Sequence, residues 1–150
     1  MQKLNFPAFQ AQIQEGPQGP QIYDILRKKY VLLTPEEWVR QHLLNYLIMH
    51  KAYPQVLIGM EKALSVNKLV KRYDLLCYNR KGQPLLLAEC KSPSVKLSQA
   101  TILQAANYNT EIKASVIILS NGLQTYCMQQ NEDKSWKQLS EVPAFGEFEG

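Results

Sequence analysis

A chain of 150 residues with 45% hydrophobic and 20% charged residues can bury a substantial core and is too apolar for extensive disorder. Its formal charge of +4, from 17 Lys and Arg against 13 Asp and Glu, permits a polyanionic partner but does not prove one. No apolar run approaches the roughly 20 residues of a membrane span, and the N-terminus lacks a secretory signal. With three Cys at no zinc-ligand spacing, these features predict one cytoplasmic domain with reduced thiols.

The first 30 residues give weak signals. Residues 1–21 show only a faint alternation at 9–13 before the turn-rich run at 16–20, so we expect a short edge element followed by a loop. Residues 22–30 mix apolar and basic side chains and predict one or two helical turns.

A helix begins clearly after this segment. Thr34 is a suitable N-cap, Pro35 suits the first helical position, and Glu37 at the third position completes a capping box. Apolar residues then recur at three- and four-residue spacing, which marks a buried face. The helix is expected to end before Pro54.

The remaining chain alternates strands and helices. We expect strands at 56–60, 73–78 and 85–91, a helix at 98–108, and strands at 114–120 and 123–129. The short connection at 79–82 predicts an antiparallel hairpin. The order predicts an α/β fold, a mixed central sheet of about five strands flanked by helices. Within one domain, residues 22–130 form the expected core and 131–150 a C-terminal segment.

Three charged residues lie in otherwise apolar strands, Asp74 in the second and Glu89 and Lys91 in the third. Buried charges are costly unless they are paired or bound to metal. Because side chains alternate along a strand, Glu89 and Lys91 share one face while Cys90 points away, and a hairpin can bring Asp74 beside Glu89. Two carboxylates and an amine around one point can hold a divalent cation and an activated water. The alternative is a structural ion pair at a sheet edge.

This pattern resembles the PD-(D/E)XK nuclease superfamily, and more closely a stand-alone form of the N-terminal nuclease domain of type I restriction enzyme R subunits. Asp74 matches the acidic residue on strand two, and Glu89-Cys90-Lys91 matches the E-x-K element. A departure is that Tyr73, rather than Pro, precedes Asp74. The resemblance covers roughly residues 22–130 and implies a restriction-endonuclease-like fold.

The same resemblance implies Mg²⁺-dependent hydrolysis of phosphodiester bonds in DNA, with Mn²⁺ as a substitute. Asp74, Glu89 and the backbone carbonyl of Cys90 would hold the cation, whose preference is for hard oxygen ligands. Lys91 would orient or help deprotonate the attacking water and stabilise charge on the phosphate. A catalytically silent module for binding nucleic acid or protein, on the same fold, is the alternative function.

The first expected helix adds one acidic candidate. Residues 34–41 are similar to the acidic first helix of the family. Since the capping box accounts for Glu37, and Glu36 precedes Val39 by three residues on the inward face, we assign an additional site role to Glu36. The alternative is a favourable interaction of Glu36 with the helix dipole. Arg40, four residues later, can pair with Glu36.

The second expected helix adds two polar candidates. Gln104-Ala105-Ala106-Asn107-Tyr108 looks like the Q-x-x-x-Y element of some family members. Gln104 and Tyr108 lie about one turn apart and can position water or substrate. In the alternative, Tyr108 packs its ring on the core. Six basic residues are candidate phosphate contacts or ordinary solvated charges: Arg27, Lys28, Lys29, Lys68, Lys71 and Arg72.

Overall fold

The computed structural model describes residues 1–66 and 69–148, without the side chains of 60–66, 69–72, 108, 110 and 111. Its elements, in order, are β1 (Ile13–Gly16), β2 (Gly19–Asp24), β3 (Lys29–Leu32), α1 (Pro35–His50), η1 (Gln55–Leu57), β4 (Ile58–Val66), β5 (Leu69–Tyr78), β6 (Pro84–Cys90), α2 (Gln99–Ile112), β7 (Val116–Ser120), β8 (Thr125–Gln130), β9 (Trp136–Leu139) and η2 (Phe145–Phe148). In this part of the chain, neither α-helix has the length and apolar character needed to cross a membrane.

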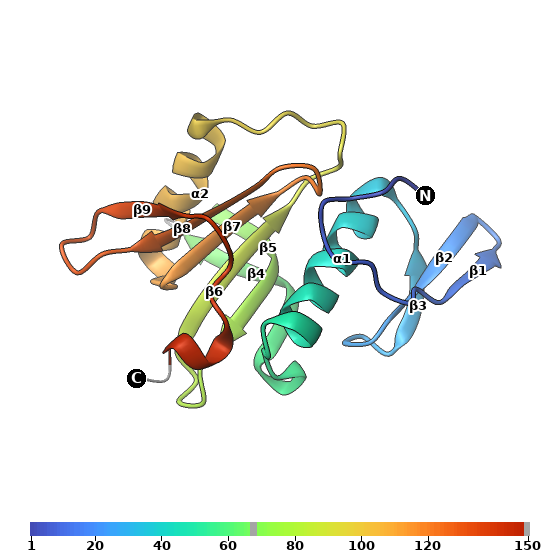
Figure 1. Ribbon diagram of the computed structural model, residues 1–150, viewed down its shortest axis with the longest axis horizontal. Coiled ribbons are helices and arrows are strands. Elements are labelled where there is room, and N and C mark those ends of the chain that lie inside the picture. Colours follow the sequence, from blue (N-terminus) through green and yellow to red (C-terminus); the bar gives the residue numbers. More distant parts are fainter. Residues whose placement is uncertain (67–68, 149–150) are drawn as a thin grey trace.

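The strands form two sheets, with α1 between them (Figure 1). The larger sheet has the order β4-β5-β6-β7-β8-β9, and its neighbours are antiparallel except for the parallel pair β6 and β7. α1 packs into the core on one face of this sheet, and α2 into the core on the other. The expected mixed sheet flanked by helices is therefore confirmed.

The start of α1 follows the predicted cap. The Thr34 hydroxyl accepts the backbone N–H of Glu37 at 3.0 Å, and Pro35 is the first helical residue. The apolar side chains of α1 that face the sheet are completely buried, namely Val39, Leu43, Leu44 and Leu47. The Glu37 side chain is also buried, in a network of ion pairs, so it does more than the expected capping box requires.

The prediction of helical turns at residues 22–30 is wrong, because β2 and β3 form a hairpin there. The Asp24 carboxylate accepts the backbone N–H groups of Leu26 at 2.8 Å and Arg27 at 3.1 Å. This local turn competes with helix formation, as short acidic side chains often do. The left-handed backbone of Lys28, with φ of 54°, completes the reversal. β1 begins only at Ile13, where the faint alternation ends, and the expected loop at 16–20 holds the end of β1 and the start of β2.

Further boundaries differ from the expected ones: β5 begins at Leu69 and not at 73, and α2 continues to Ile112, beyond 108. Residues 55–57 form a 3-10 turn in which Val56 is 89% exposed, so the strand begins only at Ile58. The polar segment around Trp136 forms β9, the edge strand beside β8, and was not expected as a strand. Edge strands need only one buried face, so β9 carries a short and mostly polar sequence.

Candidate functional site at the ends of strands β5 and β6

The candidate site lies where strands β5 and β6 stop pairing. Leu75 opposite Ala88 is the last pair of their antiparallel register, and the next positions are Asp74 and Glu89. Beyond that pair, the Asp74 carboxylate accepts the backbone N–H of Cys90 at 2.6 Å. A side-chain acceptor thus replaces a backbone one, and it fixes Asp74 against the end of β6.

The direction of side chains along β5 changes phase at Asp74. Leu75 belongs to the core on the α1 side, and Leu76 to the core on the α2 side. Tyr73 also belongs to the α2 side, although it precedes Leu76 by three positions. Strict alternation would place those two on opposite faces. The irregularity allows the carboxylate of Asp74 to reach helix α1.

Arg40 of α1 is the main partner of Asp74. Its Nη2 and Nε lie 2.5 Å and 3.1 Å from Asp74 Oδ1, and its Nη1 lies 2.6 Å from Glu37 Oε1. Burial alone would lower the pKa of the Arg40 guanidinium, but Asp74 and then Glu37 raise it above its ordinary value. The expected pairing of Arg40 with Glu36 is present only at 4.0 Å. The pairing of Arg40 with Asp74 was not predicted from the sequence. The position of Arg40 next to Val39, on the edge of the buried face of the helix, was the signal that could have indicated a buried partner.

The ion pairs continue from Arg40 to the β2–β3 turn. Glu37 Oε1 also binds Arg27 Nη2 at 3.1 Å, and Arg27 Nε binds Asp24 Oδ2 at 2.6 Å. Gln41 Nε2 donates to both acids, at 3.1 Å each. Burial opposes ionisation of Asp24, yet hydrogen bonds from the Arg27 backbone and side chain lower its pKa. The network links the smaller sheet to Asp74 through α1, and Arg27 belongs to it instead of contacting solvent as a free cation.

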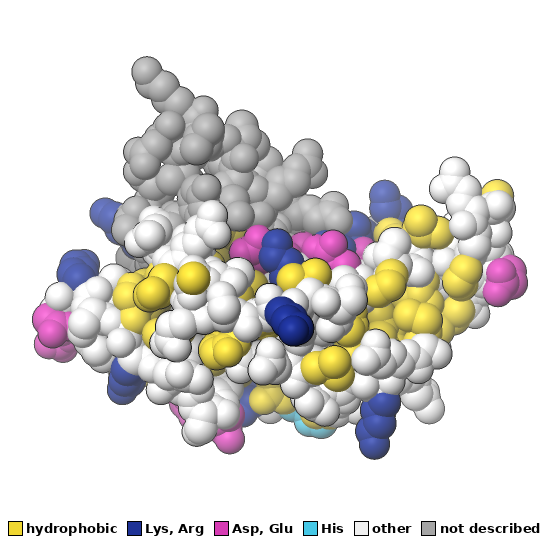
Figure 2. All heavy atoms as spheres, turned by 90° about the horizontal axis from the view of Figure 1, so that it is seen from above, with side chains coloured by type: hydrophobic (Ala, Val, Ile, Leu, Met, Phe, Trp, Pro, Cys, Tyr) yellow, Lys and Arg dark blue, Asp and Glu magenta, His cyan; other side chains and the backbone are white. Residues whose placement is uncertain are grey.

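Glu89 and Lys91 lie together at the end of β6. Lys91 Nζ is 3.4 Å from Glu89 Oε1, and the two side chains are 36% and 14% exposed, respectively. The Lys91 backbone N–H donates to Ser120 at the end of β7, at 2.8 Å. Glu89 is a half-buried acid, while the Lys91 amine remains accessible from solvent. Figure 2 shows acidic and basic side chains side by side near the centre of one face.

Glu36 does not occupy the expected inward position. Its side chain is 48% exposed, whereas Glu37 is only 6% exposed, so the expected orientation of this acidic pair is wrong. Glu36 still lies near the cluster, with Oε1 4.0 Å from Arg40 Nη2. In this position partial burial and then the Asp74 charge raise the pKa of Glu36, while Arg40 and Lys91 oppose the rise. It therefore stands at the solvent edge of the site.

The structure does not join the second helix to this cluster. Gln104 is exposed on α2, and no contact in the described residues links it to Asp74, Glu89 or Lys91. The Tyr108 side chain lies outside the described residues, as do Lys68 and the side chains of Lys71 and Arg72. Lys28 in the β2–β3 turn and Lys29 at the start of β3 are both exposed.

The described residues offer few ligands for a metal. Among them, no group of three or more His, Cys, Asp or Glu side chains is arranged to hold an ion. The candidate ligands are therefore two carboxylates, Asp74 and Glu89, together with the main-chain carbonyl of Cys90. All are hard oxygen donors of the kind that Mg²⁺ prefers, so the chemistry of the donor set fits this ion. Asp74 Oδ1 would have to exchange Arg40 for the metal.

Comparison with known proteins identifies a family for most of the chain. A family model described as type I restriction enzyme R protein N terminus matches residues 35–143. A similar solved structure is a fragment described as an HsdR subunit of a type I restriction enzyme from Vibrio vulnificus YJ016, with a TM-score of 0.57 and 17% identity over 75% of this chain. The chain corresponds to 24% of that fragment. Comparison with curated proteins gives no significant match.

Proposed function

Because the chain belongs to the family of type I restriction enzyme R protein N termini, we propose that it is a metal-dependent nuclease domain acting on DNA. The observation that supports this proposal is the placement of Asp74 and Glu89 on neighbouring strands, with Lys91 directly after the end of β6 and paired with Glu89. These three residues all lie inside the matched segment. An acid pair with an accessible amine is suited to phosphodiester hydrolysis.

Asp74, Glu89 and the Cys90 carbonyl would hold Mg²⁺, with Mn²⁺ as a substitute. The ion would supply polarisation of the phosphate and a lowered pKa for the attacking water. Asp74 is prepared for this role by the Cys90 N–H, which fixes one oxygen. Arg40 neutralises the other oxygen and would move toward Glu37, its second partner, when the carboxylate is needed.

The remaining roles fall to side chains with access to solvent. Lys91 would orient or help deprotonate the attacking water and stabilise charge that develops on the phosphate, since its ammonium is accessible beside Glu89. Glu36 would accept a hydrogen bond from water at the edge of the site, where the charges of Lys91 and Asp74 both act on its carboxylate. Gln104 and Tyr108 are proposed to position substrate from α2.

Cleavage of DNA by matched lysine variants tests this proposal. Wild-type protein with Mg²⁺ or Mn²⁺ is expected to cut DNA, and Lys91→Ala to lose about a hundredfold or more in rate. Lys29→Ala, which removes an exposed lysine from the smaller sheet, is the control and should cut normally. DNA binding should weaken only modestly in Lys91→Ala, because one lysine supplies one phosphate contact. Equal cutting by Lys91→Ala and wild type would indicate a contaminating nuclease.

A silent nucleic-acid-binding module remains the second candidate, and the Arg40–Asp74 ion pair is the observation that favours it. An arginine that permanently neutralises Asp74 would exclude a cation from the site. A ligand specific to the folded state raises the melting temperature by mass action, so metal titration separates the two functions. Stabilisation of wild type but not of Asp74→Ala by Mg²⁺ or Mn²⁺ supports the nuclease. No metal effect and no cleavage across several substrates would support the silent module.

A further inference from the structure

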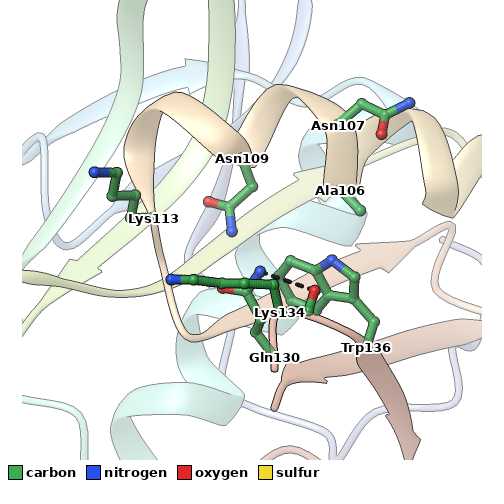
Figure 3. Close-up of a pocket in the computed structure, with 7 residues that line it drawn as sticks. All are labelled: Ala106, Asn107, Asn109, Lys113, Gln130, Lys134 and Trp136. Atoms are coloured by element: carbon green, nitrogen blue, oxygen red, sulfur yellow. Dashed lines mark hydrogen bonds between the residues drawn. The ribbon is translucent and has the colours of Figure 1, made fainter. Parts of the chain in front are cut away.

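A second candidate ligand site lies between helix α2 and the β8–β9 hairpin. It is a pocket of about 530 Å³, within the usual range of roughly 300–1,000 Å³ for small-molecule sites. Trp136, Gln130 and Lys134 line it from the hairpin, and Lys113 lines it from the end of α2 (Figure 3).

This pocket is remote from the candidate nuclease site. Strands β6 and β7 run parallel, and Cys90 lies opposite Ser120 at the far end of β7. Lys113 lies just before Val116, the first residue of β7, at the opposite end of the strand from Ser120. At about 3.3 Å per residue, the length of β7 separates the two sites by roughly 15 Å. The same bound nucleotide therefore cannot fill both.

The pocket combines one aromatic wall with two cations. Trp136 is partly buried against the α2-side core, which holds its indole in place. An indole is a good stacking surface for a nucleobase, and every base has a face that can stack. The Lys113 and Lys134 ammonium groups supply donors for a phosphate. An aromatic ring beside two lysines thus matches both halves of a nucleotide.

The neighbouring polar groups are mostly committed to the protein. Gln130 Nε2 donates to the Lys134 carbonyl at 3.3 Å, which ties the two ends of the β8–β9 turn together. Asn109 exchanges two hydrogen bonds with the backbone of Ala114, so it forms part of the wall. The turn also carries two acids, but the Asp133 carboxylate is bound by Ser135 and Glu132 does not line the pocket. Among the described side chains, Lys113 and Lys134 are therefore the charged groups that line the pocket.

We propose that this pocket binds one unpaired nucleotide of single-stranded nucleic acid, with the base against Trp136 and the phosphate between Lys113 and Lys134. A base within a duplex is already stacked and paired, so its face is not available to the indole. The site gives the protein a preference for single-stranded segments. This function goes beyond the proposed nuclease, because it requires neither metal nor cleavage.

Binding of a fluorescent single-stranded DNA oligonucleotide in EDTA, followed by anisotropy, tests the proposal without cleavage. Trp136→Leu should weaken binding about tenfold by removing the stacking surface, and Trp136→Phe should weaken it less. The oligonucleotide should quench the indole fluorescence of wild-type protein on binding. This quenching should disappear in both variants, apart from any contribution of Trp38. Thermal melts establish that each variant is folded, and Trp136→Phe keeps the packing if Trp136→Leu does not fold.

The two lysines are tested by substitution with Asn, which tolerates the left-handed backbone of Lys113 (φ 65°) and Lys134 (φ 74°). Each change should weaken binding several-fold and reduce the salt dependence of log K by about 0.7, the value for one phosphate contact to a single strand. Lys28→Asn is the matched control, since Lys28 has φ of 54° and lies in the distant β2–β3 turn. Its binding should equal that of wild type.

Several outcomes would overturn the proposal. They are equal weakening by Lys28→Asn, undiminished binding of an oligonucleotide with abasic sites, duplex binding that equals single-strand binding, and no measurable binding at low salt. Failure of the nuclease has a different signature. A protein that never cuts DNA, yet binds single strands through Trp136, retains this site and loses only the proposed catalysis.

Discussion

Replacing Asp74 with Ala removes the carboxylate that joins α1 to the end of β6. The wild-type group accepts two contacts from Arg40 at 2.5 Å and 3.1 Å, and one from the Cys90 N–H at 2.6 Å. The variant leaves Arg40 paired with Glu37 at 2.6 Å, so the guanidinium is not isolated. The backbone N–H of Cys90, a fully buried residue, loses its charged acceptor.

The cost follows from these partners. Hydrogen bonds to a charged group contribute about 1.5–3 kcal/mol, and an unsatisfied buried donor costs about 1–3 kcal/mol. The two contributions overlap, since one carboxylate makes all the contacts, so we expect a loss of about 3 kcal/mol. At about 2–4 °C per kcal/mol for a chain of this size, the melting temperature should fall by about 6–12 °C.

Thermal unfolding followed by circular dichroism, in EDTA, measures the effect without metal. The melting temperature of Asp74→Asn should fall by about half as much as that of Asp74→Ala, because the Asn amide oxygen can still accept the Cys90 N–H. Asp133→Ala is a control, since that exposed carboxylate binds only within its own turn and should change the melting temperature little. An Asp74→Ala protein that melts at or above wild type would refute the reasoning. Repulsion between the Asp74 and Glu89 carboxylates would then outweigh the bonds to Arg40.

Three other properties follow from the described contacts. Arg40→Met should lower the melting temperature in EDTA and enlarge the Mg²⁺-induced rise, because Asp74 no longer has a competing cation; an unchanged Mg²⁺ effect would contradict this competition. Burial lowers the pKa of His42 below its ordinary 6.5, despite the Trp38 carbonyl, so stability should be complete above pH 6.5 and fall as pH decreases through the lowered pKa. His42→Gln should lose this part of the pH dependence in melts from pH 5 to 8. The three buried thiols, whose pKa values burial raises, should react slowly with a thiol reagent until denaturant is added; rapid labelling of the native protein would contradict their burial.

The sequence predicted elements whose local chemistry and periodicity agree. Thr34 caps α1 as expected, and the apolar run at 114–120 contains the fully buried strand β7. The smaller sheet was not predicted, because the Asp24 turn overrides a mixed apolar and basic segment. The edge strand β9 was missed because its polar residues resemble a loop. Such outcomes depend on tertiary partners, which periodicity does not encode.

The candidate site was likewise predicted only in part. Alternation along one strand sufficed to place Glu89 and Lys91 together, as their 3.4 Å ion pair shows. It did not reveal the change of phase at Asp74 or the guanidinium of Arg40 beside it. Those features arise where a helix crosses the end of a strand, and they depend on the relative positions of both. The assignment of Glu36 to the inward face failed because helical spacing locates neighbouring positions only approximately, and Glu37 occupies the buried one.

The network of ion pairs that runs from Asp24 through α1 to Asp74 bears on how much of the chain the fold needs. The family match begins at residue 35, after the smaller sheet. A shortened protein starting there would contain every proposed metal ligand, yet it would lack Arg27 and leave the buried Glu37 with one arginine in place of two. Thr34, the cap of α1, would also be absent. The contacts of Asp24 and Arg27 thus support the helix that carries Arg40, and we expect a protein that starts at residue 35 to be less stable than one that includes them.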